Sequence, residues 1–360
     1  MTIAERTETA TKFAGLSQAK LDALLEPHLE AAISSLDGPA ALLPGMARYH
    51  FGLADEQLRP TPPDPRAQGK RIRPRIAILC CVAAGGDANA AAPLGAAIEL
   101  LHNFTLIHDD IQDRGEQRHH RPTVWSRWGE GQAINAGDAV FAAAHLALLR
   151  LRETSVPDSL ILRLVEAFDQ MTIEIVTGQV LDLGFEGRAN VTANDYLKMI
   201  AGKTAAIIRY AAGAGAIVGG ADDAHADRFG AFGRALGLGF QIRDDLLGIW
   251  GAPETTGKAA TDDIRQRKQT LPILILRERA DEEDRRALDT LYARPEIDQD
   301  GIDRVLALLE RYEVRTAIEA RVSAYHDDAR STLETATGMG ANPARDTLIE
   351  LVDSLATRSG

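Results

Sequence analysis

Apolar residues recur at helical spacing along most of the chain. Near the N-terminus, Leu21, Leu25 and Leu29 follow the four-residue spacing of a helix with one buried side. In residues 75–85 and 91–113 the apolar residues are too dense for a surface helix, so both segments are expected to be largely buried. The pattern predicts one or two helices before Tyr49 and further helices over residues 75–85, 91–113, 134–151, 160–184, 193–217, 224–250, 277–292, 302–330 and 343–356.

A proline-rich segment interrupts this pattern. Residues 59–65 (RPTPPDP) cannot continue a helix, because each proline lacks a backbone N–H and restricts the residue before it. We therefore expect a loop here, between an N-terminal helical arm (residues 1–60) and a catalytic domain (residues 61–360) on which the arm packs. No shift in composition marks another boundary.

Composition agrees with helix nearly throughout. Of the 360 residues, 45% are hydrophobic but only 5% are aromatic, and helix formers such as Ala and Leu dominate. Summed over the chain, these propensities predict an all-α fold.

Charge and cysteine content exclude several classes of partner. The net charge is -12 at pH 7, whereas nucleic acids and anionic membranes favour a basic surface. The only cysteines, Cys80 and Cys81, are adjacent in an apolar run, where a mutual disulfide would be strained, so buried thiols in a reducing compartment are expected. No segment has the uninterrupted apolar length needed to span a bilayer, and the N-terminus is polar. We expect a soluble, cytoplasmic protein without stable membrane insertion.

Acidic residues end the predicted helix over residues 91–113. Asp109 and Asp113 are four residues apart and share one helix face, a spacing that suits a hard divalent cation, and Asp110 lies beside them. Acids at a helix C-terminus oppose the helix dipole, which makes a ligand attractive. For this segment alone, a solvated helix end explains the acids equally well.

A second acidic pair, Asp244 and Asp245, closes another apolar run far downstream. Two such pairs on separate helices could face each other and hold metal ions between them. A phosphate ligand of these metals would require cations, since arginine makes bidentate phosphate contacts and lysine supplies a point charge. Taken alone, the first of these basic segments could be a solvated loop. The available cations are Lys70, Arg71, Arg73, Arg118, Lys203 and Lys268.

Taken in order, these motifs resemble the signature of trans-polyprenyl diphosphate synthases, and most resemble a geranylgeranyl diphosphate synthase. A chance run of so many ordered motifs is negligible compared with a single match. The motifs are Gly69-Lys70-Arg71-Ile72-Arg73-Pro74, His102, Asp109-Asp110-Ile111-Gln112-Asp113, Arg118, Pro122-Thr123, Gly178-Gln179-Val180-Leu181-Asp182-Leu183, Lys203-Thr204, Phe240-Gln241-Ile242-Arg243-Asp244-Asp245, Gly257-Lys258 and Lys268-Gln269-Thr270-Leu271-Pro272.

The resemblance implies the isoprenoid synthase fold, a single-domain bundle of about 10–15 helices around a central cavity, usually in a homodimer. It also implies a prenyltransferase that ionises an allylic diphosphate (dimethylallyl, geranyl or farnesyl) and condenses it with isopentenyl diphosphate. By this resemblance Asp109, Asp113 and Asp244 bind Mg²⁺, and Asp110 and Asp245 support them.

The resemblance assigns substrate contacts to further residues. Arg118, Lys203 and Lys268 would complete the cage around the allylic diphosphate, and Thr204 and Gln241 would stabilise the cation. Isopentenyl diphosphate would lie against Lys70, Arg73, His102 and the residue at position 119, with Gln179 at the cavity mouth. Phe104 lies one helical turn deeper than Asp109, where its ring could form the floor of the cavity and limit the product to geranylgeranyl diphosphate.

Two positions depart from the family pattern. His119 stands where a second arginine usually follows Arg118, and a neutral imidazole cannot make a bidentate phosphate contact. Gly248 stands where the second aspartate motif often has a third aspartate. Two alternatives therefore remain open: a class I terpene synthase-like lyase acting on an allylic diphosphate alone, and a non-catalytic regulatory subunit of a heteromeric synthase.

Overall fold

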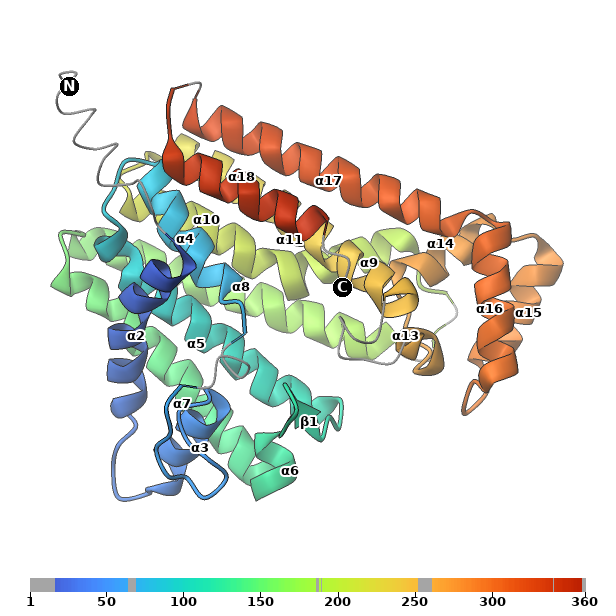
Figure 1. The fold of residues 1–360 in the computed structure, drawn as a ribbon, viewed down its shortest axis with the longest axis horizontal. Coiled ribbons are helices and arrows are strands. Elements are labelled where there is room, and N and C mark those ends of the chain that lie inside the picture. Colours follow the sequence, from blue (N-terminus) through green and yellow to red (C-terminus); the bar gives the residue numbers. More distant parts are fainter. Residues whose placement is uncertain are drawn as a thin grey trace. The chain divides into compact units, whose positions relative to one another are not determined.

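Helices make up nearly all of the regular structure, which confirms the predicted all-α class (Figure 1). The computed structural model describes residues 17–63, 69–185, 188, 190–251, 261–338 and 340–357, so the Gly257-Lys258 motif lies outside the described residues. The helices are α2 (Gln18–Ser34), α3 (Leu42–His50), α4 (Ile72–Ala83), α5 (Ala88–Gln112), α6 (Val124–Trp128), α7 (Glu130–Leu149), η1 (Arg150–Glu153), α8 (Asp158–Phe185), α9 (Ala193–Ile200), η2 (Ala201–Ala205), α10 (Ala206–Val218), α11 (Asp223–Trp250), α13 (Asp262–Arg265), α14 (Leu271–Arg279), α15 (Glu282–Tyr292), α16 (Gln299–Arg311), α17 (Val314–Thr337) and α18 (Pro343–Ala356).

The chain divides into two compact units. Unit 1 comprises Met1–Ala167, Ala211–Ala226 and Ala341–Ala344; unit 2 comprises Phe168–Tyr210, Asp227–Gly340 and Arg345–Gly360. Helices α2 and α3 belong to unit 1 together with α4, α5 and α7, so the division does not follow the expected boundary at residue 60. The assignment of a separate N-terminal arm stays a prediction.

Unit 1 is built around α5, which runs beside α4 and α7 (Figure 1). Most α5 side chains are buried, as are those of α4, which confirms the burial predicted from their dense apolar pattern. Helix α2 packs closely on α5, since a Cβ at Gly95 would lie 2.7 Å from Leu25 Cδ2. The thiols of Cys80 and Cys81 are free and buried, as predicted, and burial raises the pKa of Cys81 to about 12.

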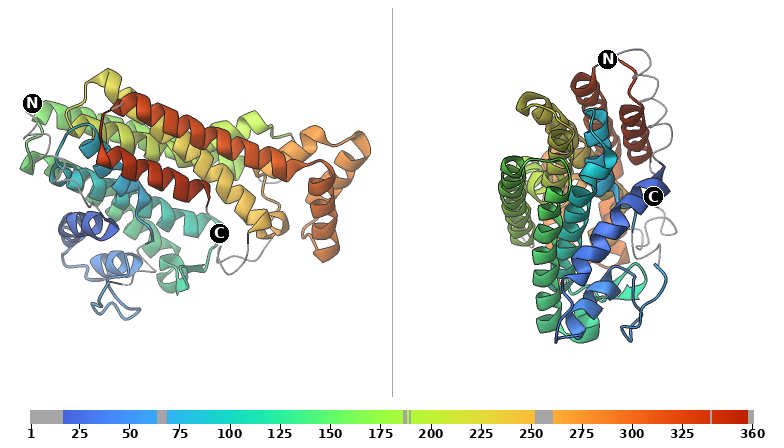
Figure 2. Two further views of the ribbon diagram at one scale, coloured as in Figure 1. Left: turned by 45° about the horizontal axis from the view of Figure 1, so that its top comes forward. Right: turned by 90° about the vertical axis from the view of Figure 1, so that its left-hand side faces the viewer.

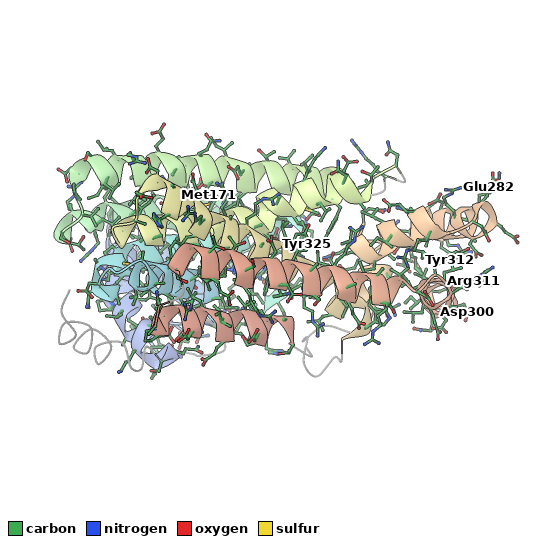
Figure 3. The ribbon with its side chains drawn as sticks, turned by 90° about the horizontal axis from the view of Figure 1, so that it is seen from above. Met171, Glu282, Asp300, Arg311, Tyr312 and Tyr325 are labelled. Atoms are coloured by element: carbon green, nitrogen blue, oxygen red, sulfur yellow. The ribbon has the colours of Figure 1, made fainter. Side chains whose placement is uncertain are left out.

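Unit 2 has its own apolar core around α14, whose residues from Leu271 to Arg277 are all buried. Helices α17 and α18 lie side by side (Figure 2), and Arg330 joins them by donating from Nε and Nη2 to Asp353 Oδ1 (2.9 and 2.6 Å). At one end of the unit, Arg311 and Tyr312 lie near α15 (Figure 3), and both donate to Asp284 Oδ2.

Two predicted helices are each divided in the structure. The segment 277–292 breaks at Ala280 and Asp281, and the segment 302–330 breaks at Tyr312 and Glu313, so both predictions of one continuous helix are wrong. Asp281 caps α15 by accepting from Asp284 N (2.9 Å), and Glu313 takes the left-handed conformation (φ 49°) before α17. Apolar residues recur at helical spacing on both sides of each break, which explains why the pattern concealed the breaks.

Two helices are long and apolar enough to cross a membrane by length and composition alone, Ala88–Gln112 and Glu130–Glu153. The prediction concerned an uninterrupted apolar run, and polar residues such as His102 and Asn103 do interrupt α5, so the absence of membrane insertion stays a prediction. Buried core helices meet the same criterion, and 72% of the apolar window of α5 is buried.

Candidate active site

The first aspartate motif, Asp109 to Asp113, ends α5 in unit 1. Asp109 is partly buried, whereas Asp113 is exposed at the C-cap, where its backbone N–H donates to Asp109 O (2.8 Å). Asp110 points to the interior and accepts from Arg118 Nε and Nη2 at its Oδ1 (3.0 and 2.8 Å). Burial raises the pKa of Asp110, while the Arg118 hydrogen bond opposes that rise. The motif therefore combines accessible acids with a buried, paired one.

A hairpin after this motif holds Arg118 in place. Strands β1 (Gln117–Arg118) and β2 (Arg121–Pro122) pair antiparallel, and the two residues between them, His119 and His120, both have positive φ (52° and 61°). Thr123 Oγ1 and Trp125 Nε1 both donate to Gly115 O (2.8 Å each) and fasten the loop. Burial and then Arg118 lower the pKa of His119, so its imidazole is neutral near pH 7.

The residues predicted to bind the second substrate lie in the same unit. Lys70 is exposed just before α4, and Arg73 Nη1 donates to His102 Nε2 (3.1 Å). Burial and then Arg73 hold the pKa of His102 well below its usual value, so the ring is a neutral acceptor. Of this pair Arg73 therefore carries the positive charge, and His102 accepts its hydrogen bond.

Phe104 belongs to an aromatic cluster between α5 and α7. Its ring centroid is 4.9 Å from that of Phe141 on α7 and 4.8 Å from that of His108 on α5. The two helices approach closely beside it, since a Cβ at Gly137 would lie 2.3 Å from His108 Nε2. Neighbours on both helices thus restrain the Phe104 ring.

The second aspartate motif, Asp244 to Gly248, lies near the end of α11 in unit 2. Asp244 is partly buried, whereas Asp245 is buried and accepts from Tyr196 Oη, Gln241 Nε2 (3.2 Å) and the backbone N–H of Leu271 (3.2 Å). Burial raises the pKa of Asp245 to about 7, against the lowering effect of the Tyr196 hydrogen bond. This motif repeats the arrangement of the first, with a buried, bonded acid next to a more accessible one.

The predicted Lys203 and Thr204 lie in η2, a π-helical turn between α9 and α10. Such turns are uncommon and often mark functional sites. Lys203 Nζ donates to Asp182 Oδ2 (2.5 Å) on α8, and Thr204 Oγ1 donates to Gln241 Oε1 (2.8 Å) on α11. The π-turn therefore connects Lys203 and Thr204 to two other helices of unit 2.

Two glycines let α8 approach this turn. A Cβ at Gly178 would lie 2.2 Å from Lys203 N, and a Cβ at Gly202 would lie 2.6 Å from Glu174 O. Only backbone without a side chain fits at these distances. Gly178 therefore helps to fix the position of Lys203.

The predicted Mg²⁺ ligands fit a metal held mainly by its substrate. Among the described residues, no three His, Cys, Asp or Glu side chains form a ready-made metal site. Magnesium usually binds one or two carboxylates and completes its coordination with water and phosphate oxygens. Asp109 and Asp113, one turn apart and not fully buried, suit that mode, as does the partly buried Asp244.

Several residues at the site carried no sequence signal. Tyr196 on α9 is buried against Asp245, and nothing in its local sequence marks it. Asn103 on α5 donates to Glu99 O (2.8 Å) and bonds His50 through Oδ1 (3.0 Å), which links α5 to α3.

The predicted Gln179 lies on α8 near Lys203, one residue from Gly178. Lys268, also predicted, is 4.0 Å from Asp263, which the sequence did not single out.

An all-α protein with two aspartate motifs, each ending an apolar helix, has the architecture of the isoprenoid synthases. The chain belongs to the polyprenyl synthetase family, because the family model "Polyprenyl synthetase" matches residues 65–309. This confirms the predicted family.

Comparisons with individual proteins agree. A (2E,6E)-farnesyl diphosphate synthase of Mycobacterium tuberculosis is 42% identical over 249 residues, which cover 69% of this chain and 63% of that protein. A geranylgeranyl diphosphate synthase of the same organism is 42% identical over 248 residues, covering 69% and 68%. The crystal structure of a polyprenyl synthetase from Streptomyces coelicolor A3(2) matches with a TM-score of 0.83 and 33% identity, over 94% of this chain and 98% of that chain. The predicted isoprenoid synthase fold is thereby confirmed.

Proposed function

We propose that this chain is a Mg²⁺-dependent trans-prenyltransferase that condenses isopentenyl diphosphate with an allylic diphosphate, with geranylgeranyl diphosphate as the product. The observation that carries the proposal is the contrast in burial between the acids of each aspartate motif. Asp109, Asp113 and Asp244 are more accessible, while Asp110 and Asp245 are buried and bonded to the protein. The family's named relatives include both farnesyl and geranylgeranyl diphosphate synthases, so product length rests on Phe104.

Asp109 and Asp113 in the first motif, and Asp244 in the second, would each hold metal. Bound Mg²⁺ supplies positive charge that stabilises the departing diphosphate. The side chains of Lys203 and Lys268 contribute positive charge. Arg118, which is held in place by its ion pair with Asp110, contributes another positive charge. These fixed charges favour cleavage of the allylic C–O bond, because they stabilise the negative charge that develops on the leaving group.

The second half of the reaction uses the other cationic residues. Lys70 and Arg73 bind isopentenyl diphosphate, whose double bond attacks the allylic carbon and forms the new C–C bond. The released diphosphate accepts the proton that isopentenyl diphosphate then loses. Thr204 Oγ1 donates its proton to Gln241 Oε1, so its lone pairs remain to stabilise a nearby cation.

Truncating Phe104 should lengthen the product. Phe104→Ala removes the ring that packs on Phe141 and opens space below the first aspartate motif. We expect products at least one isoprene unit longer, measured by mass spectrometry of the prenyl diphosphates. Phe104→Tyr keeps the ring and should leave the distribution unchanged; an unchanged distribution in Phe104→Ala would show that Phe104 does not set product length.

Restoring an arginine beside Arg118 should strengthen binding of the second substrate. His119 is neutral near pH 7, whereas His119→Arg adds a permanent charge and two donors. We expect KM for isopentenyl diphosphate to fall about tenfold, the order of one charge-assisted hydrogen bond. Steady-state kinetics test this, with His120→Arg as the neighbouring control. An equal fall in both variants would indicate general electrostatic attraction instead.

Dimerisation in the cytoplasm is part of the proposal. Large apolar side chains are exposed on α7 and α8, at Ile134, Leu146, Leu162, Ile173, Val176 and Val180. Three of those on α8, at 173, 176 and 180, recur at the spacing of one helix face. Apolar patches of this kind commonly mark interfaces, and a second copy of the chain is the partner we propose.

The rate of diphosphate release separates the synthase from the two alternatives. With Mg²⁺ and an allylic diphosphate, the synthase should release diphosphate rapidly only after isopentenyl diphosphate is added. Rapid release from the allylic substrate alone would indicate a lyase. No release in either case would indicate a non-catalytic subunit.

A further inference from the structure

A side chain from another segment of unit 2 occupies the space at the third position of the second aspartate motif. Gly248 holds that position near the end of α11, and a Cβ there would lie 2.0 Å from Asp263 Oδ2 and 2.8 Å from Asp263 Cγ. The Asp263 carboxylate, carried by α13 (Asp262–Arg265), therefore fills the space in which a side chain of residue 248 would begin. Any other residue at 248 would displace it.

Nothing in the local backbone requires glycine at 248. The residue lies within a helix and not in the left-handed region, where glycine would be favoured. Glycine inside a helix costs about 1 kcal/mol relative to alanine. The space that it leaves is the feature that explains its presence, and Asp263 uses that space.

Asp263 also faces a predicted substrate contact. Its side chain is only 12% exposed, and its Oδ1 lies 4.0 Å from Lys268 Nζ. The backbone N–H of Lys268 donates to Asp263 O (2.9 Å). The two residues are therefore in contact through their backbones as well as through their side chains. A largely buried carboxylate thus lies between the second aspartate motif and Lys268.

We infer that Asp263 is a positioning residue that supplies the carboxylate missing from position 248 and orients Lys268 beside the second aspartate motif. The inference rests on the proposed function, because it concerns how that motif and Lys268 bind the metal and diphosphate. Asp263 acts through its neighbours: among the described residues it joins no cluster of three metal-ligating side chains. Groups of this kind commonly change metal affinity by about 10–100-fold when they are removed.

Moving the carboxylate between the two positions tests the inference. The full-length chain and four variants are compared: Asp263→Asn, Gly248→Asp, Asp263→Gly, and Gly248→Asp combined with Asp263→Gly. Asp303→Asn, an exposed change on α16, is the matched control for loss of one acid. Calorimetry measures the affinity of inorganic diphosphate at several Mg²⁺ concentrations, and kinetics separate KM from kcat. Melting temperatures identify any variant that fails to fold.

Asp263→Asn keeps the shape of the side chain, so it should fold and bind diphosphate about tenfold more weakly with a higher Mg²⁺ requirement. Gly248→Asp should bind still more weakly, because it adds a clash and a second charge. The double variant, Gly248→Asp with Asp263→Gly, should bind diphosphate with an affinity within about threefold of that of the unchanged chain.

Three results would overturn the inference. Unchanged diphosphate affinity and Mg²⁺ dependence in Asp263→Asn would do so. So would a double variant, Gly248→Asp with Asp263→Gly, that binds diphosphate no more tightly than Gly248→Asp alone. A loss of melting temperature in Asp263→Asn without loss of diphosphate affinity would show a merely structural role. If the unchanged chain itself shows no Mg²⁺-dependent binding of diphosphate, the proposed function fails first, and this inference fails with it.

Discussion

Asp109→Asn and Asp244→Asn should each lower kcat by about 10³-fold or more, the largest effect expected of any single substitution. Asparagine keeps the shape of the side chain but removes the negative charge that holds a divalent cation. Because each residue is proposed to bind metal, raising the Mg²⁺ concentration should recover only part of the loss. Steady-state kinetics at several Mg²⁺ concentrations measure both effects.

Two other acids provide the comparison, one exposed and one buried. Asp303→Asn changes an exposed acid on α16 and should leave kcat unchanged. Asp110→Asn should lower activity through a misplaced Arg118, and it should also lower the melting temperature, because it leaves a partly buried guanidinium without its charged partner. An Asp244→Asn variant that keeps more than a tenth of the activity would contradict the metal-binding role of the second motif.

Gly178→Ala should destabilise the protein by about 3 kcal/mol, the upper range for overpacking. The added methyl would lie 2.2 Å from Lys203 N and 2.8 Å from Lys203 Cα, and backbone atoms cannot rotate away as a side chain can. Any fraction that folds should have a displaced π-turn and a raised KM for the allylic diphosphate. Chemical denaturation and steady-state kinetics measure the two effects.

Gly184→Ala is the matched control on the same helix. Apart from its chain neighbours and the backbone of its own helix, no atom of the described residues lies within 4 Å of the position that its Cβ would take, so the change should be neutral or stabilise by up to about 1 kcal/mol through better helix propensity. Equal effects of the two substitutions would show that helix propensity, and not close packing on Lys203, governs position 178.

The long helices could be predicted because their apolar spacing is decided locally. The prediction of residues 224–250 matches α11 to within one residue at its start, and that of 160–184 falls two residues short of the start of α8. The breaks at residues 280–281 and 312–313 escaped because neither contains proline or glycine. Asp281 followed by Asp284 is a capping signal that could have revealed the first break.

The site could be predicted only in part, for a physical reason. Charged residues such as Asp109 and Lys203 stand out because acids and cations beside apolar helices are costly without a purpose. Their partners depend on tertiary contacts between distant segments, as Tyr196 with Asp245 and Asp263 with Gly248 do. His102 was expected to bind substrate directly, yet its position as the acceptor of an Arg73 hydrogen bond could not be read from sequence.

Product analysis tests the central claim most directly. The purified chain would be incubated with Mg²⁺ and dimethylallyl, geranyl or farnesyl diphosphate, with and without isopentenyl diphosphate, and all products identified by mass spectrometry. We predict that geranylgeranyl diphosphate forms only when both substrates and Mg²⁺ are present. Hydrocarbons or alcohols formed from the allylic diphosphate alone would contradict the account, because they would show an ionising enzyme that does not condense its substrates.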